Sequence, residues 1–117
     1  MDRLEILENG KVTFTYMTLK DEKELKTEPG DHEGLVNIGR DIEGTEVSIF
    51  IREKEDAKTE SYKVSLRSKN EINVSDICLM FGGGGHPRAA GCLIKGDIET
   101  VKNKIMKEVK SRLNTNS

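Results

Sequence analysis

Four consecutive glycines at residues 82–85 restrict the fold of this chain more than any other feature of its sequence. Ordering each glycine costs on the order of 0.5–1 kcal/mol of extra backbone entropy, so an ordered run needs a compensating role. The run lies between a short helix, expected to begin at the N-cap Ser75 and end at Phe81, and an apolar segment at 89–94 that is typical of a buried strand. We therefore predict an ordered loop rather than a flexible linker.

The glycines are followed at once by His86, Pro87 and Arg88. Ordered glycine loops provide either a tight reversal of the chain or a surface where an anion approaches backbone N–H groups. A histidine donor and a guanidinium that can bind a phosphate through two hydrogen bonds favour the anion site. The pattern is not a P-loop, because no Lys followed by Ser or Thr comes after the last glycine. From these residues alone, a packing turn and an anion site both stay open.

Alternation of apolar and polar residues predicts the strands. It flanks Asn9-Gly10, a dipeptide that favours the tight turn of a β-hairpin, and recurs at 45–51 and 61–69. Together with segment 89–94, these stretches give about five strands. We predict one α/β (α+β) domain over residues 1–117, with a mixed β-sheet flanked by helices.

Helical spacing of apolar residues predicts the helices. Segment 33–44 is expected to form a short helix, and Val74 and Leu79 are spaced for a hydrophobic staple around the helix that follows Ser75. Asp97 is expected to cap a final helix. The apolar stripe of that helix consists of Ile98, Val101, Ile105, Val109 and Leu113.

The charges are divided unevenly along the chain. The segment that ends at Glu60 holds 9 basic and 16 acidic residues, whereas the remainder holds 10 and 5. On the strand at 61–69, Lys63, Ser65 and Arg67 share one face. A strand face with two bases is usually a solvated edge, but the charge division indicates that an anionic ligand would meet the second half.

Several classes of function are disfavoured by what the sequence lacks. Cys78 and Cys92 lie in apolar stretches without a CxxC pattern, so we expect buried thiols. Asp31-His32-Glu33 lacks the spacing of a metal site and is expected to be structural or solvent-facing. No Ser or Cys nucleophile stands beside a base, so the chain should not catalyse hydrolysis alone.

No apolar run approaches the roughly 20 residues of a membrane span, which makes the cytoplasm the default compartment.

Three stretches together resemble a known family: FGGGGHPRAAG (81–91), SLRSK (65–69) and EGLVN (33–37). They are similar to the DHHA1 domain, the C-terminal substrate-binding part of DHH-family phosphoesterases. Within that family the sequence most resembles the subgroup of oligoribonucleases that also act as phosphatases on 3'-phosphoadenosine 5'-phosphate. It implies a two-domain enzyme whose N-terminal DHH domain binds two manganese ions and performs the hydrolysis. The Asp-His-His motif of that catalytic domain has no counterpart in this chain.

The resemblance also implies a set of substrate-binding residues, with no catalytic or metal-binding residue in this chain. His86 would be a donor that neutralises charge at the substrate phosphate, and Pro87 would shape the backbone. The implied substrate-binding residues are Gly82, Gly83, Gly84, Gly85, His86, Arg88, Arg67 and Ser68, with Asn37, Arg40 and Lys63 as further candidates.

The expected partners are a short RNA or a nucleotide with a terminal phosphate, and a DHH domain in the same polypeptide, with a homodimer of the parent protein as a further expectation. Two other functions stay open. One is a general nucleic-acid-binding module, since DHHA1 domains also occur in RecJ-like exonucleases and alanyl-tRNA synthetases. The other is a structural domain whose glycine turn only packs.

Overall fold

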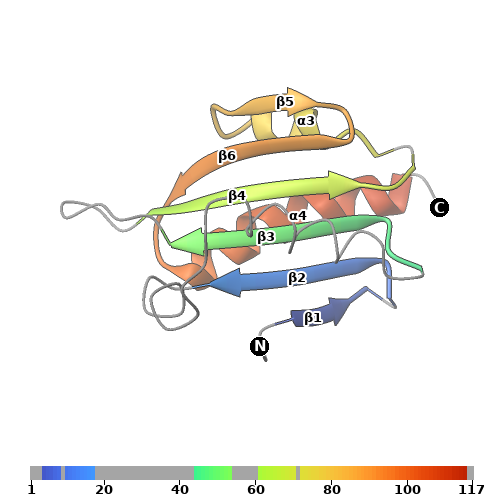
Figure 1. Ribbon diagram of the computed structural model, residues 1–117, viewed down its shortest axis with the longest axis horizontal. Coiled ribbons are helices and arrows are strands. Elements are labelled where there is room, and N and C mark those ends of the chain that lie inside the picture. Colours follow the sequence, from blue (N-terminus) through green and yellow to red (C-terminus); the bar gives the residue numbers. More distant parts are fainter. Residues whose placement is uncertain (1–3, 9, 18–43, 54–60, 71, 116–117) are drawn as a thin grey trace.

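A mixed sheet of six strands, in the order β1-β2-β3-β4-β6-β5, is the framework of the described residues (Figure 1). The structure, a computed structural model, describes residues 4–8, 10–17, 44–53, 61–70 and 72–115. Strands β2 and β3 run parallel and the other neighbouring pairs antiparallel, which confirms the predicted mixed sheet. The elements are Leu4–Leu7 (β1), Val12–Met17 (β2), Val47–Glu53 (β3), Ser61–Ser68 (β4), Val74–Leu79 (α3), Gly84–His86 (β5), Ala89–Lys95 (β6) and Ile98–Thr115 (α4).

The sixth strand is formed by the glycine run itself. We expected a loop from residue 82 to the strand at 89–94, but Gly84, Gly85 and His86 pair with β6 as strand β5. Glycine is depleted in strands, so sequence pattern gives no sign of it. Pro87 and Arg88 form the two-residue connection between β5 and β6, because His86 pairs with Ala89.

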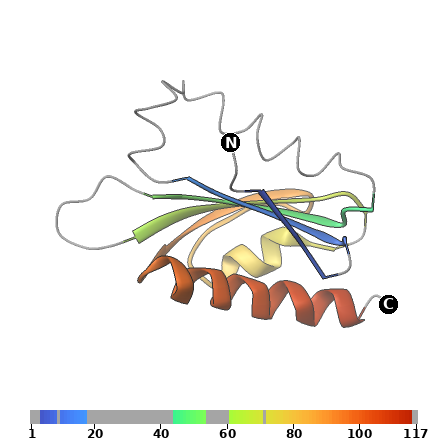
Figure 2. The ribbon, with the colours of Figure 1, turned by 90° about the horizontal axis from the view of Figure 1, so that it is seen from below.

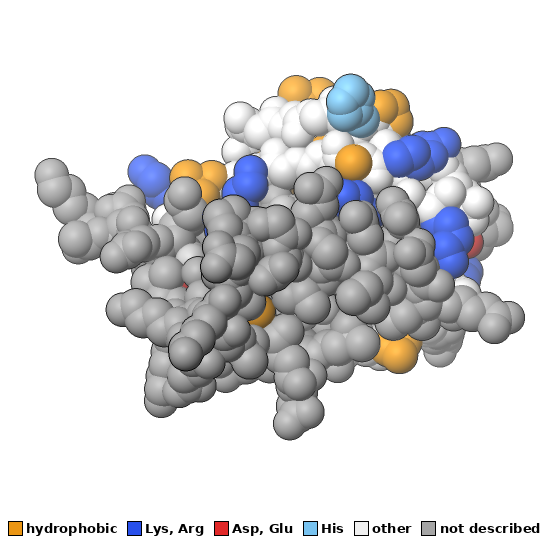
Figure 3. Space-filling view, in the orientation of Figure 1, with side chains coloured by type: hydrophobic (Ala, Val, Ile, Leu, Met, Phe, Trp, Pro, Cys, Tyr) orange, Lys and Arg blue, Asp and Glu red, His pale blue; other side chains and the backbone are white. Residues whose placement is uncertain are grey.

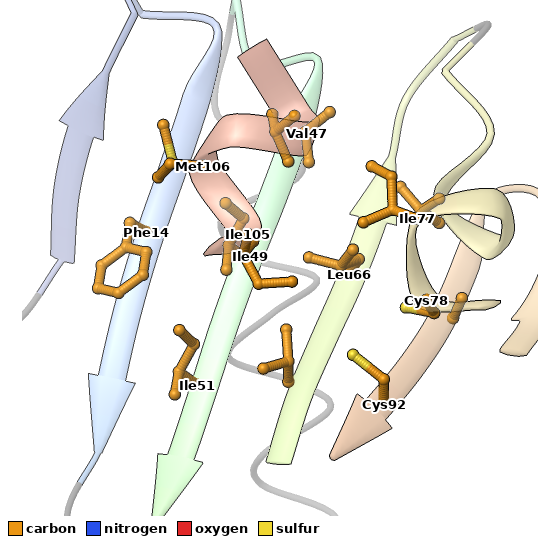
Figure 4. Close-up of a cluster of buried hydrophobic side chains, with 14 of the residues drawn as sticks. Phe14, Val47, Ile49, Ile51, Leu66, Ile77, Cys78, Cys92, Ile105 and Met106 are labelled. Atoms are coloured by element: carbon orange, nitrogen blue, oxygen red, sulfur yellow. The ribbon is translucent and has the colours of Figure 1, made fainter. Parts of the chain in front are cut away.

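Helices α3 and α4 cover one face of the sheet (Figure 2). Alternate side chains of the central strands point toward them and are buried, as the alternation at 45–51 and 61–69 predicts. The apolar stripe of α4 meets these side chains, with Ile105 fully buried beside Ile49 (Figure 4). The main core is therefore mostly aliphatic and lies between the sheet and the two helices, while Met17 and Phe50 form a separate buried cluster.

The ends of the helices differ in part from expectation. The N-cap of α3 is Asn73 rather than Ser75, and its side-chain oxygen accepts hydrogen bonds from the backbone N–H groups of Ser75 and Asp76. The predicted staple is also wrong, because Leu79 is 62% exposed. The predicted cap of α4 is confirmed, since the Asp97 carboxylate accepts a 2.8 Å hydrogen bond from Thr100 N–H.

The hairpin predicted around Asn9-Gly10 is confirmed, although its loop is longer than a two-residue turn. Leu7 pairs with Val12 across it. Gly10 has a φ of +89° and donates its N–H to the Leu7 carbonyl. The helix predicted at 33–44 lies outside the described residues, except for Gly44. Among the helices described, none combines the length and apolar character needed to cross a membrane.

Candidate functional site

The glycine run begins by ending helix α3. Gly82 has a φ of +82°, in the left-handed region that other residues rarely adopt. Its N–H donates to the Leu79 carbonyl at 3.1 Å, and the N–H of Gly83 donates to the Cys78 carbonyl at 2.9 Å. This pair of bonds is a Schellman motif, which satisfies the last carbonyls of the helix and favours glycine at the left-handed position.

The next glycines lie directly against strand β6. A Cβ at Gly83 would collide with the carbonyl oxygen of Gly91 and with Cys92. A Cβ at Gly85, whose φ is +148°, would lie 2.6 Å from the Ala89 carbonyl oxygen. Packing therefore requires glycine at both positions, whatever ligand the loop meets.

Gly84 differs from the other three glycines. A Cβ there would meet only the Leu79 side chain, at an ordinary 3.8 Å, and its φ does not lie in the left-handed region. The packing-turn hypothesis thus accounts for Gly82, Gly83 and Gly85 but leaves Gly84 unexplained. Close approach of a ligand to the backbone would account for it.

Strand register aligns the basic residues on the sheet face opposite the helices. His86 pairs with Ala89, and Ala89 pairs with Arg67, so these three residues form one row across β5, β6 and β4. Ser65 and Gly91 stand in the next row with Gly84. Figure 3 views this face and shows a histidine and several Lys or Arg side chains around its upper part.

Lys63 belongs to the same face. Its Nζ lies 3.0 Å from the point where a Cβ at Gly91 would stand, so the ammonium group lies over this glycine. The small and apolar residues at 89–94 predict a strand that another group approaches closely, and Gly91 is the position where Lys63 does so. The face therefore combines an exposed histidine with two partly buried bases, Lys63 and Arg67, around small residues.

Ser68 and Arg88 lie at the end of this region and are held together by hydrogen bonds. The Ser68 hydroxyl is buried and donates to the Ile72 carbonyl at 2.7 Å, while Ser68 N–H donates to the Arg88 carbonyl at 3.1 Å. Arg88 donates to the Ile72 carbonyl at 3.4 Å, and Val74 N–H donates to the Pro87 carbonyl at 2.9 Å. The hydroxyl of Ser68 thus stabilises the connection next to the β5–β6 turn and lies on the other side of the sheet from Arg67. The side chain of Arg88 is exposed.

Two thiols lie behind the glycine loop. Cys78 and Cys92 are buried and free of disulfides, as predicted, and approach each other from α3 and β6 (Figure 4). Their mutual hydrogen bond and their burial raise the pKa of the Cys78 thiol above its ordinary value. The positive charges of Lys63 and Arg67 lower it, but by less. The same hydrogen bond lowers the pKa of the Cys92 thiol. Both thiols are buried among apolar side chains, so a reagent in solution does not reach them and the pair packs the loop.

The remaining candidates are not placed at this site. Asn37 and Arg40 lie outside the described residues, as does Asp31-His32-Glu33. Within the described ranges, no group of three His, Cys, Asp or Glu side chains could hold a metal ion.

Curated proteins with similar sequences share one description. The chain is 37% identical over 84 residues to a bifunctional oligoribonuclease and PAP phosphatase NrnA of Thermus thermophilus, a match that covers 71% of this chain and 25% of the relative. It is 32% identical over 102 residues to the protein so described in Mycoplasma genitalium, over 86% of this chain and 30% of the relative. The chain thus spans under a third of the length of these relatives.

Solved structures show the same fold. An exopolyphosphatase-related protein from Bacteroides fragilis matches with a TM-score of 0.79 and 26% identity, over 92% of this chain and 31% of that one. A pGpG-specific phosphodiesterase from Vibrio cholerae matches with a TM-score of 0.60 and 15% identity, over 94% and 36%. The family model of the DHHA1 domain matches residues 9–115. The chain therefore belongs to the DHHA1 domain family.

Proposed function

We propose that this domain binds the phosphate of a short oligoribonucleotide or of 3'-phosphoadenosine 5'-phosphate and presents it to a catalytic DHH domain in the same polypeptide. The observation that carries the proposal is the row formed by His86, Ala89 and Arg67, next to Gly84. The descriptions of the curated relatives, which name an oligoribonuclease and a PAP phosphatase, support this class of substrate.

The chemistry of the row suits a terminal phosphate. Arg67 supplies a guanidinium, Lys63 an ammonium group and His86 a ring N–H, and charge-assisted hydrogen bonds to phosphate are the strong ones. Gly84 and Gly91 carry no side chain of their own, and the ammonium group of Lys63 lies over Gly91, so a phosphate that approaches this part of the sheet would meet a cation. Arg88 extends the positive charge to the neighbouring turn.

Hydrolysis is assigned to the DHH domain rather than to this chain. Manganese ions there would polarise the phosphate and activate water. The described residues offer no cluster of ligands for such a metal, so we place the metal site outside them. The homodimer of the parent protein and its cytoplasmic location belong to the same proposal.

A titration of the 117-residue chain followed by NMR tests the binding. Adding a diribonucleotide with a 5'-phosphate, or 3'-phosphoadenosine 5'-phosphate, should shift the amide signals of Gly84 and His86. Binding should weaken with salt, because phosphate contacts displace counterions. Amide signals that stay unmoved at millimolar concentrations of both ligands would end the proposal for the isolated domain.

Variants separate this function from the two alternatives. His86→Ala and Arg67→Gln should weaken binding about tenfold each, since a charge-assisted hydrogen bond contributes roughly 1.5–3 kcal/mol. Lys104→Gln, on the exposed side of α4, is the matched control and should bind normally. Tighter binding of tRNA or long single strands would favour the general nucleic-acid module. Full activity of the intact parent with His86→Ala would favour the structural domain.

A further inference from the structure

A cavity of about 570 Å³ opens at one end of the sheet, beside the proposed phosphate site. Three basic residues line it from three different connections: Lys11 from the β1–β2 loop, Lys69 after β4 and Arg88 from the β5–β6 turn. These connections and the end of α4 lie together at the right of Figure 1. No motif of the sequence singles out this arrangement, because the residues come together only in the folded chain.

The backbone around the cavity fixes two of these bases on either side of Glu46. Glu46 N–H donates to the Lys11 carbonyl at 2.7 Å, and Lys69 N–H donates to the Glu46 carbonyl at 3.0 Å. The Glu46 carboxylate accepts hydrogen bonds of 3.1 and 2.9 Å from the side-chain amide of Asn70. Among the described residues that line the cavity, the three bases face this one acid. The part of the lining that the structure describes is therefore net positive and suits an anion.

The inner wall of the cavity is apolar. Ile72 and Leu113 line it and are 4% and 8% exposed. An apolar wall beneath a polar rim is the usual lining of a small-molecule site, and cavities of roughly 300–1,000 Å³ hold such ligands. A nucleotide has a part for each region of this lining. Its base or its ribose can pack against the apolar wall, and its phosphate can bind the basic residues at the rim.

The β5–β6 turn links the cavity to the proposed phosphate site, because Arg88 lines the cavity and follows His86 closely in the chain. Arg88 lies two residues after His86, so their Cα atoms are at most about 7 Å apart. The turn is fastened to the segment that carries Ile72, through the Val74 to Pro87 and Arg88 to Ile72 hydrogen bonds. A chain of phosphates that begins at His86 can thus pass Arg88 and enter the cavity.

We propose that this cavity is a second subsite, which binds a further nucleotide of an oligoribonucleotide whose first phosphate lies at His86. The inference rests on the proposed function and adds a dependence on length to it. A dinucleotide fills mainly the sheet face, whereas a longer chain also engages Lys11 and Lys69. The domain would therefore prefer oligonucleotides of three or four residues to dinucleotides.

Binding of two ligands by charge variants of the 117-residue chain tests the subsite. The double variant Lys11→Gln, Lys69→Gln is compared with Lys104→Gln, Lys107→Gln, which removes the same charge from the exposed side of α4. The probes are a 5'-phosphorylated diribonucleotide and the corresponding tetraribonucleotide, each titrated at several salt concentrations. Inorganic phosphate and AMP are added as competitors to distinguish an oligonucleotide from a free anion.

The Lys11 and Lys69 double variant should bind the tetranucleotide about tenfold more weakly and the dinucleotide within about twofold of the parent, because it can no longer neutralise one or two phosphates of the longer ligand. The slope of log K against log salt should flatten by about 0.7 for each phosphate that the variant leaves without a cationic partner. The control pair should bind both ligands as the parent does. Thermal melting of both variants confirms that folding is intact.

Equal losses for the two ligands, or equal losses in the control pair, would show a general charge effect and overturn the subsite. Tetranucleotide binding that the double variant leaves unchanged would overturn it as well. The same holds if inorganic phosphate or AMP displaces the dinucleotide and the tetranucleotide from the parent at the same competitor concentration. The proposed function fails separately: if His86→Ala leaves both ligands unaffected while the Lys11 and Lys69 variant loses the tetranucleotide, the cavity binds RNA and the sheet face does not.

Discussion

The ammonium group of Lys63 lies over Gly91, only 3.0 Å from where the first carbon of a side chain would stand. The missing side chain on β6 thus lets the tip of Lys63 rest against the sheet. The Val64 carbonyl, 3.3 Å from the same point, belongs to backbone and cannot yield as a lysine tip can.

Gly91→Ala should therefore displace Lys63 at a modest loss of stability, of about 1 kcal/mol, as overpacking by one methyl group usually costs about that much or more. Dinucleotide binding should weaken several-fold because the ammonium group moves. Isothermal titration and urea unfolding of the same preparation measure both effects. Binding that stays at the parent level would show that Lys63 does not touch the ligand.

Gly83→Ala and Gly84→Ala form a matched pair within the glycine run. A Cβ at Gly83 collides with strand β6, so this substitution should destabilise the fold by about 3 kcal/mol or prevent folding. A Cβ at Gly84 meets only Leu79 at 3.8 Å, so stability should change by less than about 1 kcal/mol, because Ala also reduces the entropy of the unfolded chain.

Ligand binding then distinguishes the two hypotheses for Gly84. If a phosphate approaches its backbone, Gly84→Ala should weaken dinucleotide binding while leaving the thermal midpoint nearly unchanged. Normal binding by a stable Gly84→Ala variant would leave the run as a packing turn.

The N-cap of α4 predicts an acid-dependent part of the stability. Hydrogen bonds from Thr100 hold the pKa of Asp97 below its ordinary value of 3.8. The folded state therefore favours the carboxylate, so its stabilisation is complete above pH 3.8 and is lost as the pH falls through the lower folded-state pKa. Asp97→Asn keeps an oxygen that can cap the helix but does not titrate.

Urea unfolding between pH 2 and pH 6 should accordingly show a smaller decline with falling pH for Asp97→Asn than for the parent. The difference between the two curves should lie below about pH 4. Parallel curves over that range would mean that Asp97 does not differ in pKa between the folded and unfolded chain.

The buried thiols predict slow modification. Because Cys78 is buried and its pKa is raised, it should react with a thiol reagent at pH 7 only when the chain opens. Mass spectrometry should find both cysteines unmodified in the folded chain and both modified in urea. Rapid labelling of the folded chain would contradict the packing described for the loop.

The sequence was sufficient for the parts of the fold that depend on simple periodicity. Alternation placed β3 and β4, and the apolar stripe placed α4, because burial on one face imposes a fixed spacing of apolar residues. The family resemblance also implied that Arg67 lies beside His86, and the strand register puts the two residues in one row. The sequence could not place β5, because Gly84 and Gly85 have no strand propensity and pair only as a result of tertiary contact with β6.

Other differences arise where neighbouring residues are chemically equivalent. Asn73 and Ser75 can both cap a helix, and the choice between them depends on the backbone conformation at Asn73. The cavity lined by Lys11, Lys69 and Arg88 was not predicted, since residues so far apart in the chain share no local pattern.

Strand β5 stands at the end of the strand order, which makes the glycine run an edge of the sheet. Exposed edges invite pairing with other chains, and proteins commonly limit that risk by keeping the edge strand short. At three residues, Gly84–His86 is too short and too poor in side chains to template another strand. The shortness of β5 therefore protects the domain from aggregating through this edge.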